Sequence, residues 1–67
     1  MTQEEFLFML RDTHDKMFLT KKEARKELNI SEGTLDRLRK NGTISSKKIL
    51  GQIMFDIGEL ARFMADA

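Results

Sequence analysis

The feature that most constrains the fold of this chain is a pair of helix-start signals close together near its middle. Thr20 is a good N-cap residue, and Glu23 follows three positions later. This is the spacing of a capping box, in which each side chain satisfies an unpaired backbone N–H of the other residue. Ser31 is a second N-cap candidate, because a serine oxygen accepts from the free N–H groups of a first helical turn. Together these signals predict two short helices, over residues 21–28 and 31–40.

A tight turn joins the two expected helices. Ile30 lies in this turn and is expected to fill the space between them, while Leu35 and Leu38 anchor the second helix on the core. The second helix is expected to end at Asn41-Gly42, a pair suited to a left-handed stop. Two short helices joined by about three or four residues form a helix-turn-helix. In its DNA-binding version the second helix enters the major groove, so the pattern points to a function as well as a fold.

A further helix is predicted at the start of the chain, over about residues 3–16. Thr2 and Glu5 have the capping-box spacing that would open it. Phe8 and Met9 fall off the centre of its apolar side and are candidates for a contact surface, including self-association, or for a broader buried face. The stripe expected to face the core is made of Phe6, Leu10, Thr13 and Met17.

After the second capped helix the pattern changes to β. Residues 43–49 and 52–55 lie on either side of Leu50-Gly51 and predict a two-stranded hairpin. Asp56 and Glu59 predict one more capping box and a last helix. The inward residues of that helix are expected to be Ile57, Leu60, Phe63 and Met64. The expected fold is mainly α with a small β-hairpin, in the order α-α-α-β-β-α, as a single domain over residues 1–67.

Composition excludes several classes of protein. The chain has 67 residues and no Cys, so neither a disulfide nor a thiolate metal site is expected. His14 is the one histidine, and we interpret it as a half-buried structural residue rather than a metal ligand or catalyst. No nucleophile–base arrangement or phosphate loop is present, so neither an enzyme nor a cofactor is expected. No apolar run approaches the ~20 residues that span a bilayer, and the acidic start lacks a signal peptide, which fits a cytoplasmic protein.

The charges are concentrated in one short segment. The net charge is only +1, yet residues 37–48 carry five basic side chains and no acidic one. The segments before and after it, residues 1–36 and 49–67, each have a balance of −2. Such focusing is the electrostatic footprint of a nucleic-acid surface. The alternative is a solvated surface that happens to be basic.

The expected DNA-reading surface is the side of helix 31–40 that lies opposite its leucines. Arg37 is its main candidate, because a guanidinium can bind guanine O6 and N7 or clamp a phosphate. The alternative for Arg37 is an ion pair within the helix or a free surface position. At 100° per residue this surface comprises Gly33, Asp36, Arg37 and Lys40, with Thr34 at its margin.

Lysines around this surface are expected to neutralise phosphates rather than to read bases. They are Lys40 at the end of the helix, and Lys47 and Lys48 in the first strand of the hairpin. Each such contact would steepen the dependence of binding on salt. Ser31 is foremost a cap, although the N–H groups that begin its helix could also hold a phosphate.

Three polar or small positions on this surface have two interpretations each. Asp36 could accept from cytosine N4 or repel wrong sequences, and it could equally orient Arg39 or Lys40. Thr34 could touch a phosphate or a thymine methyl, or it is a helix-start residue with a solvated hydroxyl. Gly33 would allow close backbone approach, or it is a tolerated weak helix residue.

A series of residues from Phe18 onward resembles a known family. The residues are Phe18–Ala24, Leu28–Ser31, Thr34, Leu35, Arg37, Leu38, Asn41, Gly42, Ile44, Gly51, Phe55, Glu59 and Leu60. In order and spacing they are similar to the excisionase-type helix-turn-helix family, small winged-helix proteins related to the DNA-binding heads of MerR-type regulators. The resemblance covers residues 18–65 and leaves residues 1–17 outside.

The resemblance implies that the helix from Ser31 to Lys40 docks in a major groove with the hairpin as a wing beside it. Members commonly act as recombination directionality factors, which bind near attachment sites of mobile elements and bend DNA for the integrase. Others regulate transcription. The resemblance places Thr34 and Arg37 at DNA-facing positions and Lys48 at a position that is often basic. The wing of this chain is less basic than usual.

A protein-interaction module that keeps the fold without binding DNA is the remaining alternative. Its apolar contacts would come from Phe8, Met9, Phe18 and Met54. The leading hypothesis is a double-stranded DNA-binding protein that acts as an excisionase, or recombination directionality factor, of a mobile element, with an integrase or recombinase as a further partner. A small transcriptional regulator is the alternative within the same class.

Overall fold

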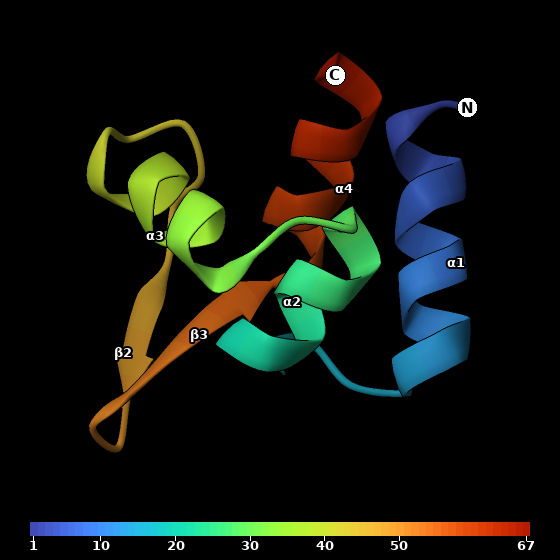
Figure 1. Ribbon diagram of the computed structural model, residues 1–67. Coiled ribbons are helices and arrows are strands. Elements are labelled where there is room, and N and C mark those ends of the chain that lie inside the picture. The colour runs from blue at the N-terminus through green and yellow to red at the C-terminus, as the bar shows by residue number, and fades with distance from the viewer.

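The computed structural model describes all of residues 1–67 as four helices and three strands (Figure 1). The mainly helical architecture with a small antiparallel sheet confirms the winged helix-turn-helix prediction. One strand, β1, was not predicted. The elements in chain order are α1 (Gln3–His14), β1 (Phe18–Thr20), α2 (Lys21–Leu28), α3 (Glu32–Lys40), β2 (Lys47–Ile49), β3 (Gln52–Asp56) and α4 (Ile57–Asp66).

The predicted caps at Thr2, Thr20 and Ser31 all form. Thr20 Oγ1 accepts from the Glu23 amide at 3.2 Å, and Glu23 Oε1 accepts in return from the Thr20 amide at 3.0 Å. Ser31 Oγ accepts from the Thr34 amide at 3.1 Å. An N-cap side chain of this kind contributes about 1 kcal/mol, so the chain specifies these helix starts locally.

The capping box expected at the last helix is only half correct. Asp56 Oδ1 accepts from the Gly58 amide at 2.6 Å and caps α4. Glu59 does not return a bond to Asp56. Its Oε1 accepts instead from the Ser45 amide and from Arg62. A charge-assisted bond to a guanidinium is stronger than a neutral one, which accounts for the choice of partner.

The sheet has three strands rather than the two of the predicted hairpin, in the order β1-β3-β2, all antiparallel. Leu19 pairs with Phe55 across β1 and β3, and both side chains are fully buried. A strand of three residues shows no period-two pattern, so only its pairing with the distant β3 defines it. Residues 43–46, expected in the first hairpin strand, form no strand. Their backbone groups bond to Leu38 and α4 instead.

The hairpin turns at Leu50-Gly51, as predicted. Ile49 pairs with Gln52, so the loop has two residues, and φ is positive at both, +51° at Leu50 and +83° at Gly51. Two positive φ values are the signature of a type I′ turn, which favours Asn-Gly or Asp-Gly. Leucine is an unusual choice, because a β-carbon in the left-handed region costs about 1–2 kcal/mol.

The core joins α1, the sheet and the remaining helices. Nine side chains are buried: Leu10, Leu19, Ala24, Leu35, Ile44, Phe55, Ile57, Leu60 and Ala61. Helix α1 lies along α4 (Figure 1) and supplies Leu10 to this core, with Phe6 packed beside it. Ile57 and Leu60 are buried and Phe63 and Met64 pack partly buried against the core, as predicted for the last helix.

The predicted stripe of α1 is wrong at its C-terminal end. The helix stops at His14, since Asp15 has left-handed backbone angles, whereas the prediction ran to residue 16. Thr13 is exposed, and Met17 lies beyond the helix with 53% of its surface exposed. His14 is half-buried as predicted. Its Nε2 lies 2.7 Å from a carboxylate oxygen of Glu27 and links α1 to α2.

Candidate nucleic-acid interface

The helix-turn-helix is made by α2, a three-residue turn at positions 29–31, and α3. Asn29 ends α2 in the left-handed conformation, and the Ile30 amide donates to Arg25 O at 3.0 Å. Ile30 packs partly buried against the core, as expected of the residue between the helices. Helix α3 ends at Lys40 with Asn41 as its C-cap, and Gly42 takes the left-handed position with φ +84°. The local signals therefore define both ends of α3 correctly.

Helix α3 has one buried side and one open side. Leu35 is fully buried and Leu38 packs against the core. The opposite side, here called the recognition face, comprises Gly33, Asp36, Arg37 and Lys40. Together with Asn41, these residues line one shallow hollow of the surface. The structure thus brings together the four residues expected on the DNA-facing side of this helix.

Arg37 and Lys40 supply the free positive charge of the recognition face. Both side chains are exposed, and neither forms an ion pair. The alternative in which Arg37 pairs with an acid within the helix is therefore absent from the structure. Two cations on the open side of a helix can bind phosphates or the acceptor-rich edge of guanine.

Asp36 is held by two cations. Its Oδ1 lies 2.8 Å from Lys21 Nζ and 3.3 Å from Arg39 Nη2. These hydrogen bonds, the one from Lys21 first, lower the pKa of Asp36 below its ordinary value. The structure supports orientation of Arg39, one of the two interpretations of this acid. The Lys21 contact was missed, since Lys21 lies on α2 and no sequence spacing links it to α3.

Gly33 lies at the N-terminal end of the recognition face, with Ser31 and Thr34 next to it in the first turn of α3. Ser31 Oγ donates to Thr34 Oγ1 at 3.0 Å and accepts from the Thr34 amide, which is the bond that caps the helix. A β-carbon at Gly33 would meet only Ser31 Oγ, at 4.0 Å, and its φ is not in the left-handed region. No contact within the chain therefore requires glycine at this position.

The two lysines of the wing, here the β2–β3 hairpin, point to opposite sides of the sheet. Lys48 pairs with Ile53, so alternation along the strands places it on the side of Phe55 and the core. Lys47 pairs with Met54 on the other side, where its Nζ lies 5.6 Å from the centre of the Phe18 ring. The structure therefore separates Lys47 from Lys48, which the sequence had placed together.

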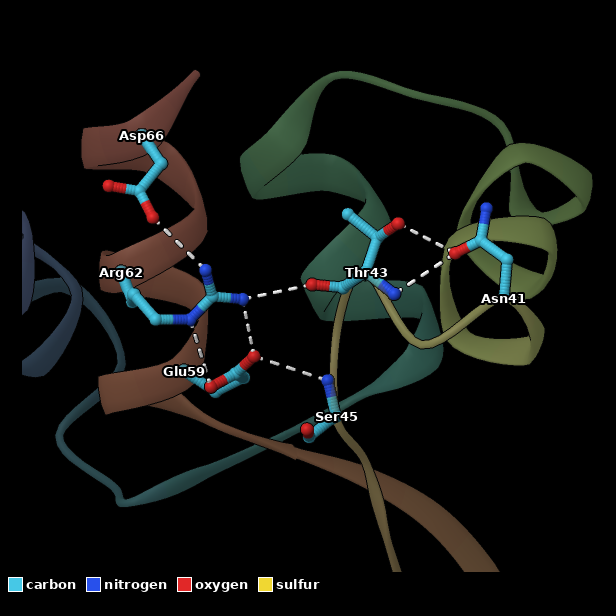
Figure 2. Close-up of polar contacts among 6 residues, drawn as sticks. All are labelled: Asn41, Thr43, Ser45, Glu59, Arg62 and Asp66. Atoms are coloured by element: carbon cyan, nitrogen blue, oxygen red, sulfur yellow. Dashed lines mark hydrogen bonds and ion pairs between the residues drawn. The ribbon is translucent and has the colours of Figure 1, made fainter.

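The connection from α3 to the wing is fastened to α4 (Figure 2). Arg62 Nη2 donates to Thr43 O at 2.9 Å, and Glu59 Oε1 accepts from the Ser45 amide at 3.2 Å. Asn41 Oδ1 accepts from the amide and hydroxyl of Thr43 at 3.0 and 2.6 Å. Arg62 also bonds Asp66 and Glu59. These contacts fix the wing relative to α3.

The charges of this group stabilise one another. The hydrogen bond from Arg62, and then that from the Ser45 amide, lower the pKa of Glu59, while Glu59 raises the pKa of Arg62. Sequence reasoning missed the group. The spacing of Glu59, Arg62 and Asp66 along one helix was visible as a signal for ion pairs. Their contacts with the α3–β2 connection were not.

The α2–α3 pair, its exposed basic residues and the adjoining wing define a winged helix-turn-helix protein. Residues 18–67 match the family described as "Helix-turn-helix domain", and this match spans most of the chain. The chain belongs to this family, the excisionase type of helix-turn-helix, as the resemblance had predicted. Membership suggests DNA binding, and members are typically not enzymes.

Helix α1 lies outside the matched segment, as the resemblance had predicted. No curated protein and no solved structure shows significant similarity to the chain. None of the four helices has both the length and the apolar character needed to cross a bilayer.

Proposed function

We propose that the protein binds double-stranded DNA by placing α3 in the major groove, with the wing against the adjoining backbone. The observation that carries this proposal is the pair of exposed, unpaired cations on the recognition face, Arg37 and Lys40, in a chain of the helix-turn-helix family. Because Leu35 fixes the opposite side of α3 in the core, these two side chains can face only outward.

The site residues have different proposed roles, which follow from their positions. Arg37 reads a guanine edge or clamps a phosphate at the centre of the recognition face. Lys40 and Lys48 bind phosphates, and Lys47 contributes more weakly because it lies on the far side of the wing. Asp36 keeps Lys21 and Arg39 in place rather than meeting a base.

The start of α3 adds neutral contacts to these charged ones. Ser31 and the free N–H groups of the first turn bind one more phosphate. Thr34 contacts the backbone or a thymine methyl beside it. Gly33 lets the duplex approach α3 closely, which is supported by the open space at this position.

For the biological role we propose an excisionase, that is, a recombination directionality factor of a mobile element in the cytoplasm of a prokaryote or in phage infection. The support is the excisionase type of the family, and the implied partner is an integrase or recombinase. The protein would act by binding alone, not as an enzyme. A small transcriptional regulator is the second candidate and would use the same recognition face.

Helix α1 supplies a surface for self-association on adjacent DNA sites. Phe8 and Met9 are 67% and 38% exposed, and they line a shallow hollow on the surface of α1. This supports contact with a second copy of the chain. Phe8→Glu is expected to abolish cooperative binding to neighbouring sites. Unchanged cooperativity would leave α1 as a packing element only.

The experiment for DNA binding is a titration of the protein with duplexes enriched from a randomised pool. Affinity is expected to fall steeply between low and moderate salt, because each phosphate contact releases counterions. Arg37→Ala is expected to weaken binding by about 1–3 kcal/mol with little change in Tm. Glu32→Ala, a change on the same helix, is the control. Failure to enrich or bind any duplex would overturn the proposal, and equal loss from both variants would overturn the role of Arg37.

A further inference from the structure

The tip of the wing carries a leucine that the fold does not explain. Leu50 is fully exposed, with 100% of its surface accessible, and its φ is +51°. The other non-glycine residues with positive φ are Asp15 and Asn29, which end helices and belong to the types that tolerate this conformation. Leu50 is thus the one apolar side chain that the chain holds in the left-handed region.

Neither packing nor turn chemistry favours leucine at this point. A fully exposed side chain gains nothing from the core, and a type I′ turn is better served by Asn or Asp. The turn nevertheless fixes the backbone at Leu50, because the paired strands extend up to it through Ile49 and Gln52. The wing therefore presents an apolar side chain at a defined point.

The charge around this point indicates the kind of partner. Residues 43–55 contain no acidic side chain and include Lys47 and Lys48. Ile49, directly before the tip, is 37% exposed. An apolar point on a positively charged ribbon fits a polyanion with an apolar interior. Duplex DNA has this character, because its phosphates enclose stacked bases that an apolar side chain can reach through the minor groove. The width of that groove, about 6 Å, admits a single narrow turn rather than a helix.

The arrangement of elements allows the tip and α3 to reach one duplex. In Figure 1 the β2–β3 turn and α3 lie on the same side of the molecule, away from α1. The longest dimension of the backbone is 28 Å. A minor groove lies about half a helical turn, roughly 17 Å, from the centre of the neighbouring major groove. The molecule is long enough to span that distance.

We propose that Leu50 is a minor-groove wedge. With α3 in the major groove, the tip of the wing enters the adjacent minor groove and the leucine inserts between two base pairs, unstacking them and kinking the duplex. The favoured step is pyrimidine–purine, which unstacks most easily. This inference rests on the proposed DNA binding and adds a residue that selects deformable sequence beside the recognition face.

The test uses a duplex of about 30 base pairs, three helical turns, that the wild-type protein enriches from a randomised pool. Its pyrimidine–purine steps on either side of the α3 site are labelled in turn with 2-aminopurine, whose fluorescence rises on unstacking. Energy transfer between dyes at the two ends reports bending. Wild type is compared with Leu50→Asn, which suits the turn but removes the wedge, and with the matched control Leu50→Met, which keeps an apolar side chain.

Wild type and Leu50→Met are expected to unstack one labelled step and to bend the duplex. Leu50→Asn is expected to raise the Tm of the free protein, since asparagine tolerates positive φ, yet to lose the fluorescence rise and most of the bend. Its affinity is expected to fall about tenfold.

Two other results overturn the inference, and they are distinguishable. If Leu50→Asn unstacks and bends the duplex like wild type, the wedge is excluded while DNA binding stands. If Leu50→Asn weakens only the association between two copies of the protein and leaves the bend unchanged, the wedge is likewise excluded. If wild type binds no duplex, the proposed function fails, and the wedge fails with it.

Discussion

The α1–α4 side of the molecule and the α3–wing side are held in place by different forces. Helices α1 and α4 supply four of the nine buried side chains, whereas α3, the α3–β2 connection and the wing supply one each, which are Leu35, Ile44 and Phe55. On the α3–wing side, polar contacts do much of the positioning, through Asp36 with Lys21 and through Arg62 with Thr43 O. One side is therefore a packed scaffold and the other an oriented, charged surface.

This contrast has a functional meaning. A surface that binds a polyanion must remain polar and open, so it cannot be fixed by burying many side chains. Directional hydrogen bonds and ion pairs fix its position instead. They contribute modestly to stability when exposed, but they define geometry. We therefore expect the loss of a buried side chain to lower stability most, and the loss of a polar contact to lower DNA binding more than stability.

The largest expected effect comes from Leu35→Ala, because Leu35 is the only buried residue of α3. The loss is expected to be about 2–5 kcal/mol, a large part of the stability of a small domain, and DNA binding should fall with the fold. Urea unfolding followed by circular dichroism measures it. Leu38→Ala, at a half-buried position, is the control with a smaller expected loss. Equal, small losses for both would show that packing does not position α3.

The next effect is expected from Arg62→Met, which removes the bonds from α4 to the α3–β2 connection. Amide exchange at Ser45 should accelerate and affinity for duplex DNA should fall, while Tm changes less than in Leu35→Ala. The matched control is Arg11→Met on α1, which removes the same charge from a residue without an ion pair. If the two variants bind DNA equally well, polar fastening of the wing has no role in binding.

The smallest effect concerns acid stability at the start of α2. The hydrogen bond from Lys16, and then that from the Thr20 amide, lower the pKa of Glu23 to about 2. A lowered folded-state pKa means that Glu23 stabilises the fold at pH above its unfolded value. That contribution disappears as the pH falls from about 4.5 toward about 2.

Solvent screening limits the size of this contribution to below about 1 kcal/mol. The midpoint of urea unfolding, measured between pH 2 and 6 for wild type and Glu23→Gln, provides the check. This pH range covers both the ordinary pKa of Glu23 and its lowered pKa in the folded protein. The variant should show a shallower dependence on pH. Parallel curves would show that Glu23 does not carry the effect.

The sequence predicted the features that are encoded locally. The caps at Thr20 and Ser31, the turn at Leu50-Gly51 and the burial of Leu35 depend on neighbours a few positions away, and all are confirmed. The clustering of Arg37 and Lys40 on one face follows from helical periodicity alone. Their roles toward DNA stay predictions.

The features that were missed depend on contacts between distant parts of the chain. Strand β1 exists because Leu19 meets Phe55, and the partner of Asp36 is Lys21 on another helix. The same holds for Arg62 and Thr43 O. A charged side chain has many possible partners along the sequence, and only the folded structure determines which of them it contacts. The opposite directions of Lys47 and Lys48 likewise depend on strand register.

The order β1-β3-β2 leaves the outer side of β2 as an open sheet edge. Open edges are templates on which another chain can add a strand and begin to aggregate, and lysines are among the residues that prevent such pairing. Lys47 and Lys48 supply two of the three residues of β2. The same lysines that are proposed to bind phosphates thus keep the free protein from pairing edge to edge. Removing both would weaken DNA binding and also make the protein more prone to aggregate through β2.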